Sequence, residues 1–236
     1  LPVIYGSFGI ERCSVLRSSF SIILVTRRSR FFAGPRFRKR GVDALGHSAN
    51  EVESEQIVID ESSRHFRQGH VTSFVQIRGS VPTFWTQQST VTMPKPPISV
   101  HRSDHTKVAT RRHFARLLER YGAPVYALNL MRKTRSNDES GLSTEFLNAV
   151  DFVNSDIPND VKIIYTHFDI KNVHKQDSQD FSRQVDSLTE VVNNYTSFYA
   201  NSSSSTTNPP DKIQSGVLRT SCVDCLDRTN VLQFFT

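Results

Sequence analysis

One segment near the end of the chain carries residues that can perform nucleophilic chemistry on phosphorus. It runs Arg219-Thr-Ser-Cys-Val-Asp-Cys-Leu-Asp-Arg-Thr-Asn-Val-Leu-Gln233. Cys222, five intervening residues, Arg228 and the hydroxyl residue Thr229 stand in the order of a cysteine-dependent phosphatase loop. The chemistry needs a thiolate at Cys222 to attack phosphorus, backbone N–H groups to hold the phosphoryl oxygens, and Arg228 as a bidentate clamp.

The elements on either side of this loop can position it. Residues 216–220 are predicted to form a short strand, and residues 228–236 can open a helix. The loop would then lie at a helix N-terminus, where free N–H groups and the helix dipole stabilise anions. The same field favours the thiolate form of Cys222.

The rest of the chain alternates short apolar strands with amphipathic helices. Its order indicates an α/β fold with a mostly parallel sheet flanked by helices, and with the phosphatase-type loop between a strand and a helix at the carboxyl edge. His167 and Asp169 alternate along one predicted strand, and we interpret them as a hydrogen-bonded pair at its end. The predicted strands are 21–25, 56–59, 74–77, 125–130 and 162–169, and the predicted helices are 106–121, 143–154 and 181–198.

The loop resembles the signature of the Sac-domain phosphoinositide phosphatases, Arg-Thr/Ser-x-Cys-x-Asp-Cys-Leu-Asp-Arg-Thr-Asn. Residues 219–230 match it at every position. Further stretches similar to the same family are 26–34 with 40–43, 46–58 and 74–85. The resemblance implies a Sac catalytic domain over residues 21–236, cut short at its C-terminal end, preceded by the end of an N-terminal subdomain over residues 1–20.

The resemblance and the chemistry together predict a phosphocysteine mechanism. Arg228 would bind two equatorial phosphoryl oxygens, and Thr229 would contact the thiolate or assist hydrolysis of the intermediate. A general acid must protonate the inositol oxygen. Asp224 is the first candidate, because like charge from the thiolate and phosphate would keep its carboxyl protonated. Asp227 is the second, and the mechanism needs neither a metal nor a cofactor.

Positive charge gathers in one stretch. The chain has a formal net charge of +6, and residues 27–40 hold seven basic residues and no acidic one. Such a stretch either attracts anionic headgroups, at about 1 kcal/mol per residue near a membrane, or is a solvated face. Beside a phosphatase loop we favour headgroup binding. The predicted substrate-binding residues are Val223, Cys225, Leu226, Arg27, Arg28, Arg36, Arg38, Lys39 and Arg40.

Other interpretations of these residues are weaker. Cys222 and Cys225 form a Cys-x-x-Cys pair, but a redox site would not explain Arg228 or Thr229, and a structural zinc site needs more ligands than the three cysteines supply. No recognised nucleic-acid module accompanies the basic stretch, so we expect no nucleic-acid partner. A catalytically silent Sac-type module that binds lipid or scaffolds partners is the remaining alternative.

Substrate and location follow only in outline. The family resemblance implies phosphatidylinositol 4-phosphate or phosphatidylinositol 3,5-bisphosphate; residues 1–6 and 74–80 favour the first, and residues 121–124 and 146–152 the second. We favour the monophosphate. The longest apolar run, 20–25, is far shorter than the roughly 20 residues that span a bilayer. We therefore expect peripheral binding, or anchoring by segments outside this chain, on the cytosolic face of the endoplasmic reticulum, Golgi, endosome or vacuole, with any regulatory protein partner binding outside this chain.

Overall fold

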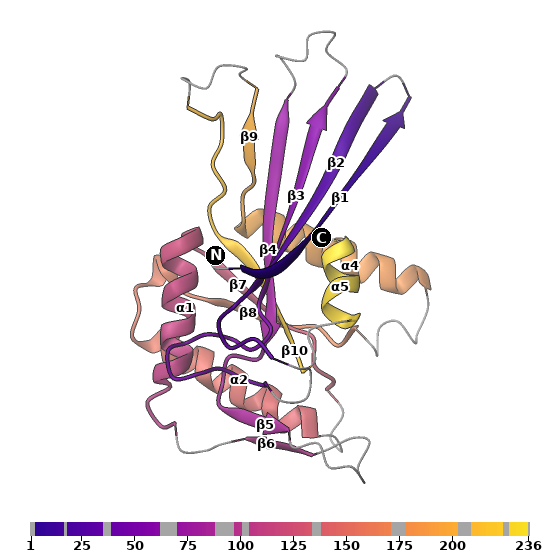
Figure 1. Cartoon of the computed structure of the whole chain (residues 1–236). Helices are drawn as coiled ribbons and strands as arrows, with labels where there is room; N and C mark the ends of the chain where they lie inside the picture. The colour runs from indigo at the N-terminus through magenta and orange to yellow at the C-terminus, as the bar shows by residue number, and fades with distance from the viewer. Residues whose placement is uncertain are drawn as a thin grey trace.

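The chain forms an α/β structure built on one mixed sheet of eight strands (Figure 1). This confirms the predicted fold class. The structure is a computed structural model, and it describes residues 3–16, 18–34, 39–61, 70–87, 97–100, 104–133, 138–170, 178–202, 209–223 and 227–235.

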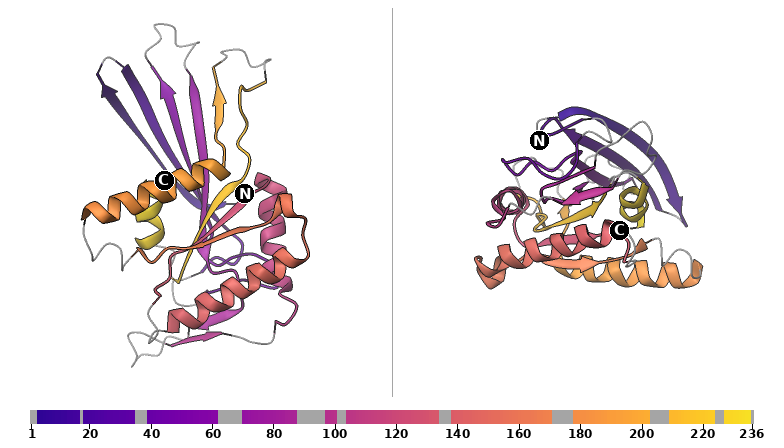
Figure 2. Two further views of the ribbon diagram at one scale, coloured as in Figure 1. Left: turned by 180° about the vertical axis from the view of Figure 1, so that it is seen from behind. Right: turned by 90° about the horizontal axis from the view of Figure 1, so that it is seen from below.

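The first half of the sheet is antiparallel. Strands β1 (Val3–Val15), β2 (Ser18–Ser29), β3 (Val52–Asp60) and β4 (Val71–Ser80) pair in chain order. A short strand, β9 (Tyr199–Asn201), pairs with the start of β4. Figure 1 shows these strands fanning out beyond the helices, and the right-hand view of Figure 2 shows the β1–β2 hairpin arching along the side of the molecule opposite α2 and α4.

The second half of the sheet is parallel and contains the strand that ends at Cys222. Strand β10 (Val217–Cys222) lies between β4 and β7 (Val125–Asn129), and β8 (Ile164–His167) follows β7. Every residue of β7 and β10 is buried, as parallel strands covered on both faces require. The predicted parallel core is therefore these four strands, and the antiparallel strands extend it on one side.

The helices cover the parallel half from both faces. Helices α1 (Val108–Tyr121) and α2 (Asp138–Ser155) pack on a cluster that includes Trp85, Phe114 and Phe146. Helices α4 (Ser178–Tyr195) and α5 (Asp227–Phe235) pack on a second cluster that includes Leu128 and Leu218. Alternate residues of β7 enter the two clusters, which places them on opposite faces. The remaining elements are the hairpin β5 (Trp85–Gln87) and β6 (Ile98–Val100) and the 3₁₀ helix η1 (Asn159–Val161).

The predicted elements are confirmed, with shifted ends. The strand predicted over residues 162–169 is shorter, so that Asp169 lies beyond β8, and the helix predicted from residue 143 begins at Asp138. Residue 20, where we expect a domain boundary, falls within β2, which pairs with both β1 and β3. The division at residue 20 stays a prediction.

Candidate active site

Cys222 is the last residue of β10 and lies at the carboxyl edge of the parallel strands. It pairs in register with Ser80 of β4, and the preceding Ser221 pairs with Asn129 of β7. Its side chain is buried in the α4–α5 cluster. Helix α5 begins at Asp227, so the predicted strand, loop and helix follow one another in the expected order. Asp224, Cys225 and Leu226 lie outside the described residues.

Arg40 contacts the backbone beside Cys222. Its Nη1 donates to the Val223 carbonyl at 2.8 Å, and its Nη2 donates to the side-chain oxygen of Gln87 at 3.0 Å. The guanidinium carbon also lies 5.8 Å from the centre of the Trp85 ring, and only 5% of Arg40 is exposed. The sequence predicts that Arg40 and Val223 bind substrate. The contacts add that Arg40 fixes the backbone directly after Cys222.

Arg228 is held at the same edge of the sheet. Its Nη1 donates to the Leu130 carbonyl at 3.0 Å and to Oε2 of Glu139 at 2.8 Å. Leu130 directly follows β7, and its own N–H donates to the Ser221 carbonyl at 2.9 Å. The edges of β7 and β10 therefore bring Arg228 close to the end of the strand that carries Cys222.

Thr229 and Asp227, two further candidate residues of the loop, differ in how exposed their side chains are. Thr229 is completely buried in the first turn of α5, whereas Asp227 is exposed at the first residue of that helix. Burial of Thr229 is compatible with a contact inside the loop.

Arg219 is the largest contributor to the site that sequence reasoning missed. It is completely buried, and it donates hydrogen bonds to the carbonyls of Gly79 (3.0 Å) and Ser80 (2.6 Å) and to the Ser48 hydroxyl (2.9 Å). It also contacts the hydroxyl of Ser221. A side chain at Gly79 would not fit, because its Cβ would stand 2.9 Å from Arg219 Nη2. Arg219 thus ties the end of β4 to β10 three residues before Cys222, and its place at the start of the family signature is the signal that could have identified it.

Two buried titratable residues lie near Arg219: His113 of α1, and Glu51, which directly precedes β3. His113 Nδ1 donates to the Gly46 carbonyl at 3.0 Å, which leaves Nε2 to accept from Arg219 Nε at 3.3 Å. Burial, with the nearby Arg219 charge, lowers the pKa of His113 well below its ordinary value. Glu51 Oε2 lies 3.9 Å from His113 Nδ1, and burial raises the pKa of Glu51. His113 is accordingly a neutral acceptor for the buried guanidinium.

The basic stretch is partly neutralised by acidic partners. Arg27 contacts Glu53 at 3.0 Å and Glu55 at 2.5 Å on the neighbouring strand β3. These carboxylates raise the pKa of Arg27. Arg28 donates to the Asn50 side chain and, at 3.0 Å, to the Gly34 carbonyl. Headgroup binding by this stretch stays a prediction. Because Glu53 and Glu55 offset the charge of Arg27, we expect Arg27 to attract an anionic headgroup less than the sequence suggests.

Of the other predicted substrate-binding residues in the basic stretch, Lys39 makes a ring contact. Lys39 Nζ lies 4.8 Å from the centre of the Phe32 ring, in a cation–π contact. Arg36 and Arg38 lie outside the described residues.

His167 and Asp169 each contact the segment that follows β7. His167 Nε2 donates to the Met131 carbonyl at 2.8 Å, and Asp169 Oδ2 accepts from the Lys133 N–H at 2.8 Å. Burial lowers the pKa of His167. Their hydrogen bonds hold the backbone on which Arg228 also rests. The direct pair between the two side chains stays a prediction.

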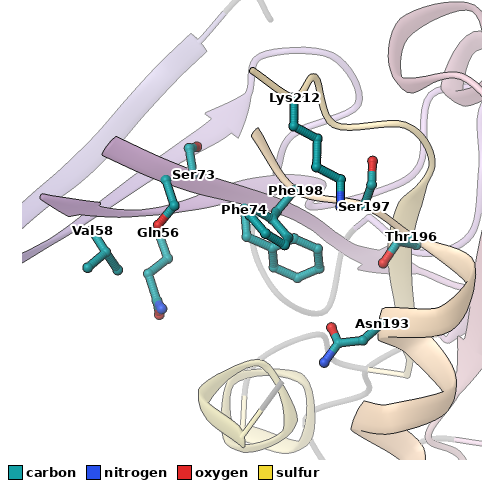
Figure 3. Close-up of a pocket in the computed structure, with 10 residues that line it drawn as sticks. Gln56, Val58, Ser73, Phe74, Asn193, Thr196, Ser197, Phe198 and Lys212 are labelled. Carbon is teal, nitrogen blue, oxygen red and sulfur yellow. The ribbon is translucent and has the colours of Figure 1, made fainter. Parts of the chain in front are cut away.

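A separate cavity of about 470 Å³ lies on the face of β3 and β4 next to α4 (Figure 3). Phe74 and Phe198 form its apolar wall, and Asn193, Thr196 and Lys212 add polar groups. Lys212 Nζ lies 4.3 Å from the centre of the Phe198 ring. Of the predicted site residues that the structure describes, none lines this cavity.

Metal and membrane features were sought in the described part of the chain. Within it, no group of three or more His, Cys, Asp or Glu side chains is placed to hold a metal ion. Among its helices, none is both long enough and apolar enough to cross a membrane.

Comparison with known proteins gives matches over almost the whole chain. Residues 1–175 match the family model described as the SacI homology domain. Phosphoinositide phosphatase SAC3 of Arabidopsis thaliana is 36% identical over 286 aligned residues, which cover 99% of this chain and 35% of the relative. Polyphosphoinositide phosphatase of Schizosaccharomyces pombe is 36% identical over 242 residues, covering 99% and 29%. Phosphatidylinositol-3-phosphatase SAC1-A of Danio rerio is 34% identical over 233 residues, covering 98% and 36%. The chain thus spans about a third of the length of the curated relatives it matches.

Proposed function

Because the chain belongs to the SacI homology domain family, we propose that it carries the catalytic loop of a phosphoinositide phosphatase that uses Cys222 as nucleophile. The observation that carries this proposal is the position of Arg228, which donates to the Leu130 carbonyl and so lies beside the end of β10 that carries Cys222. A cysteine at the end of a buried parallel strand, followed by a helix, is where the backbone N–H groups of the intervening loop can converge on an anion.

The proposed reaction has two displacement steps. The Cys222 thiolate attacks phosphorus in line, the S–P bond forms, and the bond from phosphorus to the inositol oxygen breaks. That oxygen takes a proton from Asp224 or Asp227. Water then attacks the phosphocysteine, the S–P bond breaks, and inorganic phosphate leaves with the thiolate restored. Arg228 would stabilise the charge on the equatorial oxygens in both steps.

The substrate proposal rests on the sequence and on the relatives' names. Phosphatidylinositol 4-phosphate is the first candidate, and phosphatidylinositol 3,5-bisphosphate is the second. The relatives are named as phosphatases of phosphoinositides, of polyphosphoinositides and of the 3-phosphate, so all ring positions belong in a test. The lipid would be reached at a membrane surface, with the basic stretch contributing attraction for anionic headgroups.

Phosphate release from vesicles tests the function directly. The full-length protein carrying this chain is incubated with vesicles that each contain one phosphoinositide, beside its Cys222→Ser variant. We expect release from one headgroup and a loss of at least about a thousandfold in the variant, because serine is a far weaker nucleophile without a base. Absence of release from every vesicle, together with retained vesicle binding, would instead favour the catalytically silent lipid-binding module.

A further inference from the structure

Glu139 makes the ion pair that fixes the catalytic arginine. Its Oε2 lies 2.8 Å from Arg228 Nη1, and its Oε1 lies 3.4 Å from Arg228 Nη2. The side chains of Arg228 and Glu139 are 12% and 19% exposed. Because solvent screens a pair at this depth only weakly, the carboxylate has a strong hold on the guanidinium.

The carboxylate of Glu139 is itself fixed by the backbone. Its Oε2 accepts the N–H of Arg132 at 2.9 Å, in the segment that follows β7. Glu139 is the second residue of α2, where the helix dipole stabilises negative charge. Both anchors hold Glu139 where it is independently of Arg228.

The pair uses a defined edge of the guanidinium. Nη1 and Nη2, which together form the terminal edge, point at Glu139, and Nη1 also donates to the Leu130 carbonyl at 3.0 Å. A guanidinium has a second, lateral edge made of Nε and Nη2, which can also bind two oxygens at once. A phosphoryl group would meet that lateral edge while Glu139 and Leu130 keep hold of the terminal one.

We propose that Glu139 is a positioning residue that holds Arg228 by its terminal edge so that the lateral edge clamps the phosphoryl oxygens in the transition state. This inference rests on the proposed phosphatase function. A clamp must be in place before charge develops on the oxygens, because an arginine that has to reorganise during the reaction stabilises them less. The sequence carries no sign of this role, since Glu139 lies 89 residues before Arg228 and outside the signature.

Steady-state kinetics of Glu139 variants test the positioning role. We expect Glu139→Gln to lower kcat about tenfold and Glu139→Ala about a hundredfold, within the range found for losing one oriented charge-stabilising group. KM should change by less than about twofold, because the clamp acts mainly in the transition state. Glu139→Asp should fall between wild type and Glu139→Gln, since it keeps the charge but is one methylene shorter.

Glu145→Gln is the matched control. Glu145 lies on the same helix and pairs with Lys107, away from the loop. The control should leave kcat unchanged, and thermal melting should show that both Gln variants stay folded. Unchanged kcat in Glu139→Gln, or a lower KM with kcat retained, would overturn the positioning role; the second result would mean that the carboxylate competes with substrate for Arg228.

A binding measurement separates this inference from the proposed function. Orthovanadate, an analogue of the phosphoryl transition state, is titrated into the Cys222→Ser protein by calorimetry, with and without Glu139→Gln. Positioning predicts that Glu139→Gln weakens vanadate binding about tenfold, whereas unchanged or tighter binding overturns it. Because this readout needs no turnover, failure of wild type to hydrolyse any lipid would count against the proposed function alone.

Discussion

Two groups of arginines in this chain make different kinds of contact, one group beside the loop and the other on β2. Around the loop, Arg40 and Arg219 are almost completely buried, and their hydrogen bonds go mainly to backbone carbonyls and hydroxyls. On β2, Arg27 is 32% exposed at its side chain and pairs with two carboxylates of the neighbouring strand. The two carboxylates beside Arg27 offset most of its positive field.

The difference bears on how positive charge should be located in a sequence. The run of basic residues on β2 and beyond stands out in the sequence, yet β3 sets Glu53 and Glu55 against it. Arg219 stands outside that run, at the start of the loop segment, yet it delivers its charge to the strand that ends at Cys222. Charge near Cys222 therefore comes from the buried Arg40 and Arg219, and the exposed part of the basic run contributes less than its count suggests.

Replacing Arg219 should cause the largest loss of stability and gives the sharpest test of the difference between the buried arginines and those on β2. Arg219→Met removes the donor to the Gly79 carbonyl, to the Ser48 hydroxyl and to His113 Nε2, whereas the Ser80 carbonyl keeps the Ser48 hydroxyl as donor. Unsatisfied buried groups cost roughly 1–3 kcal/mol each, so we expect a loss of about 3 kcal/mol or more in the free energy of unfolding. Urea denaturation measures it. Arg27→Met is the control, and an equal loss in both variants would erase the distinction between the regions.

Arg40→Lys should lower activity more than stability. Lysine cannot reach both the Val223 carbonyl and Gln87 as the forked guanidinium does. The backbone beside Cys222 would then be less well placed, and we expect kcat to fall about tenfold. Vesicle hydrolysis measures it beside Arg111→Lys, a control whose pair with Asp156 lies at the surface. Retained kcat in Arg40→Lys would show that Arg40 does not position the loop.

Acidification should destabilise the buried region through His113. The pKa of His113 is lowered in the folded state, so the unfolded chain binds its proton first as pH falls below about 6.5. Stability is therefore lost from about pH 6.5 downwards, by at most about 1.4 kcal/mol per pH unit. Glu51, whose pKa is raised, opposes this loss, while the fixed charges of Arg219 and Arg116 reinforce it.

The variant His113→Gln isolates that contribution. Chemical denaturation of wild type and variant between pH 7.5 and 5.5 should give a steeper dependence on pH for wild type. Equal slopes would mean that His113 is not held neutral by its surroundings.

The smallest effects are expected on β2 and just after it. Arg27→Gln should change the free energy of unfolding by less than about 1 kcal/mol, as for other partly exposed ion pairs. Lys39→Gln should weaken binding to anionic vesicles about fivefold, which corresponds to about 1 kcal/mol. Arg27→Gln should weaken vesicle binding less, because Glu53 and Glu55 already offset the charge of Arg27. Cosedimentation with vesicles ranks the two, and a larger effect for Arg27 would reverse the comparison.

Local patterns predicted the elements, but partners across long distances could not be predicted. The apolar runs of β7 and β10 and the helical spacing of α1 identify those elements because strand and helix periods are local. The antiparallel start of the sheet was not predicted, because pairing direction depends on connections rather than on residue type. The role of Glu139 could not be predicted either, since its partner Arg228 lies 89 residues away. The signature points to Arg219 but does not reveal its contacts with Ser48, Gly79 and Ser80.

The position of β10 has a consequence for how the chain folds. This strand enters between β4 and β7, and Arg219 bonds to Ser80 across 139 residues of sequence. Until β10 is synthesised, β4 and β7 each present an open parallel edge, and contacts of such long range form slowly. Cys222 therefore reaches its place only when β10 inserts between two strands that are synthesised before it. A chain interrupted before residue 217 would leave the edges of β4 and β7 that β10 covers open to strands of other molecules.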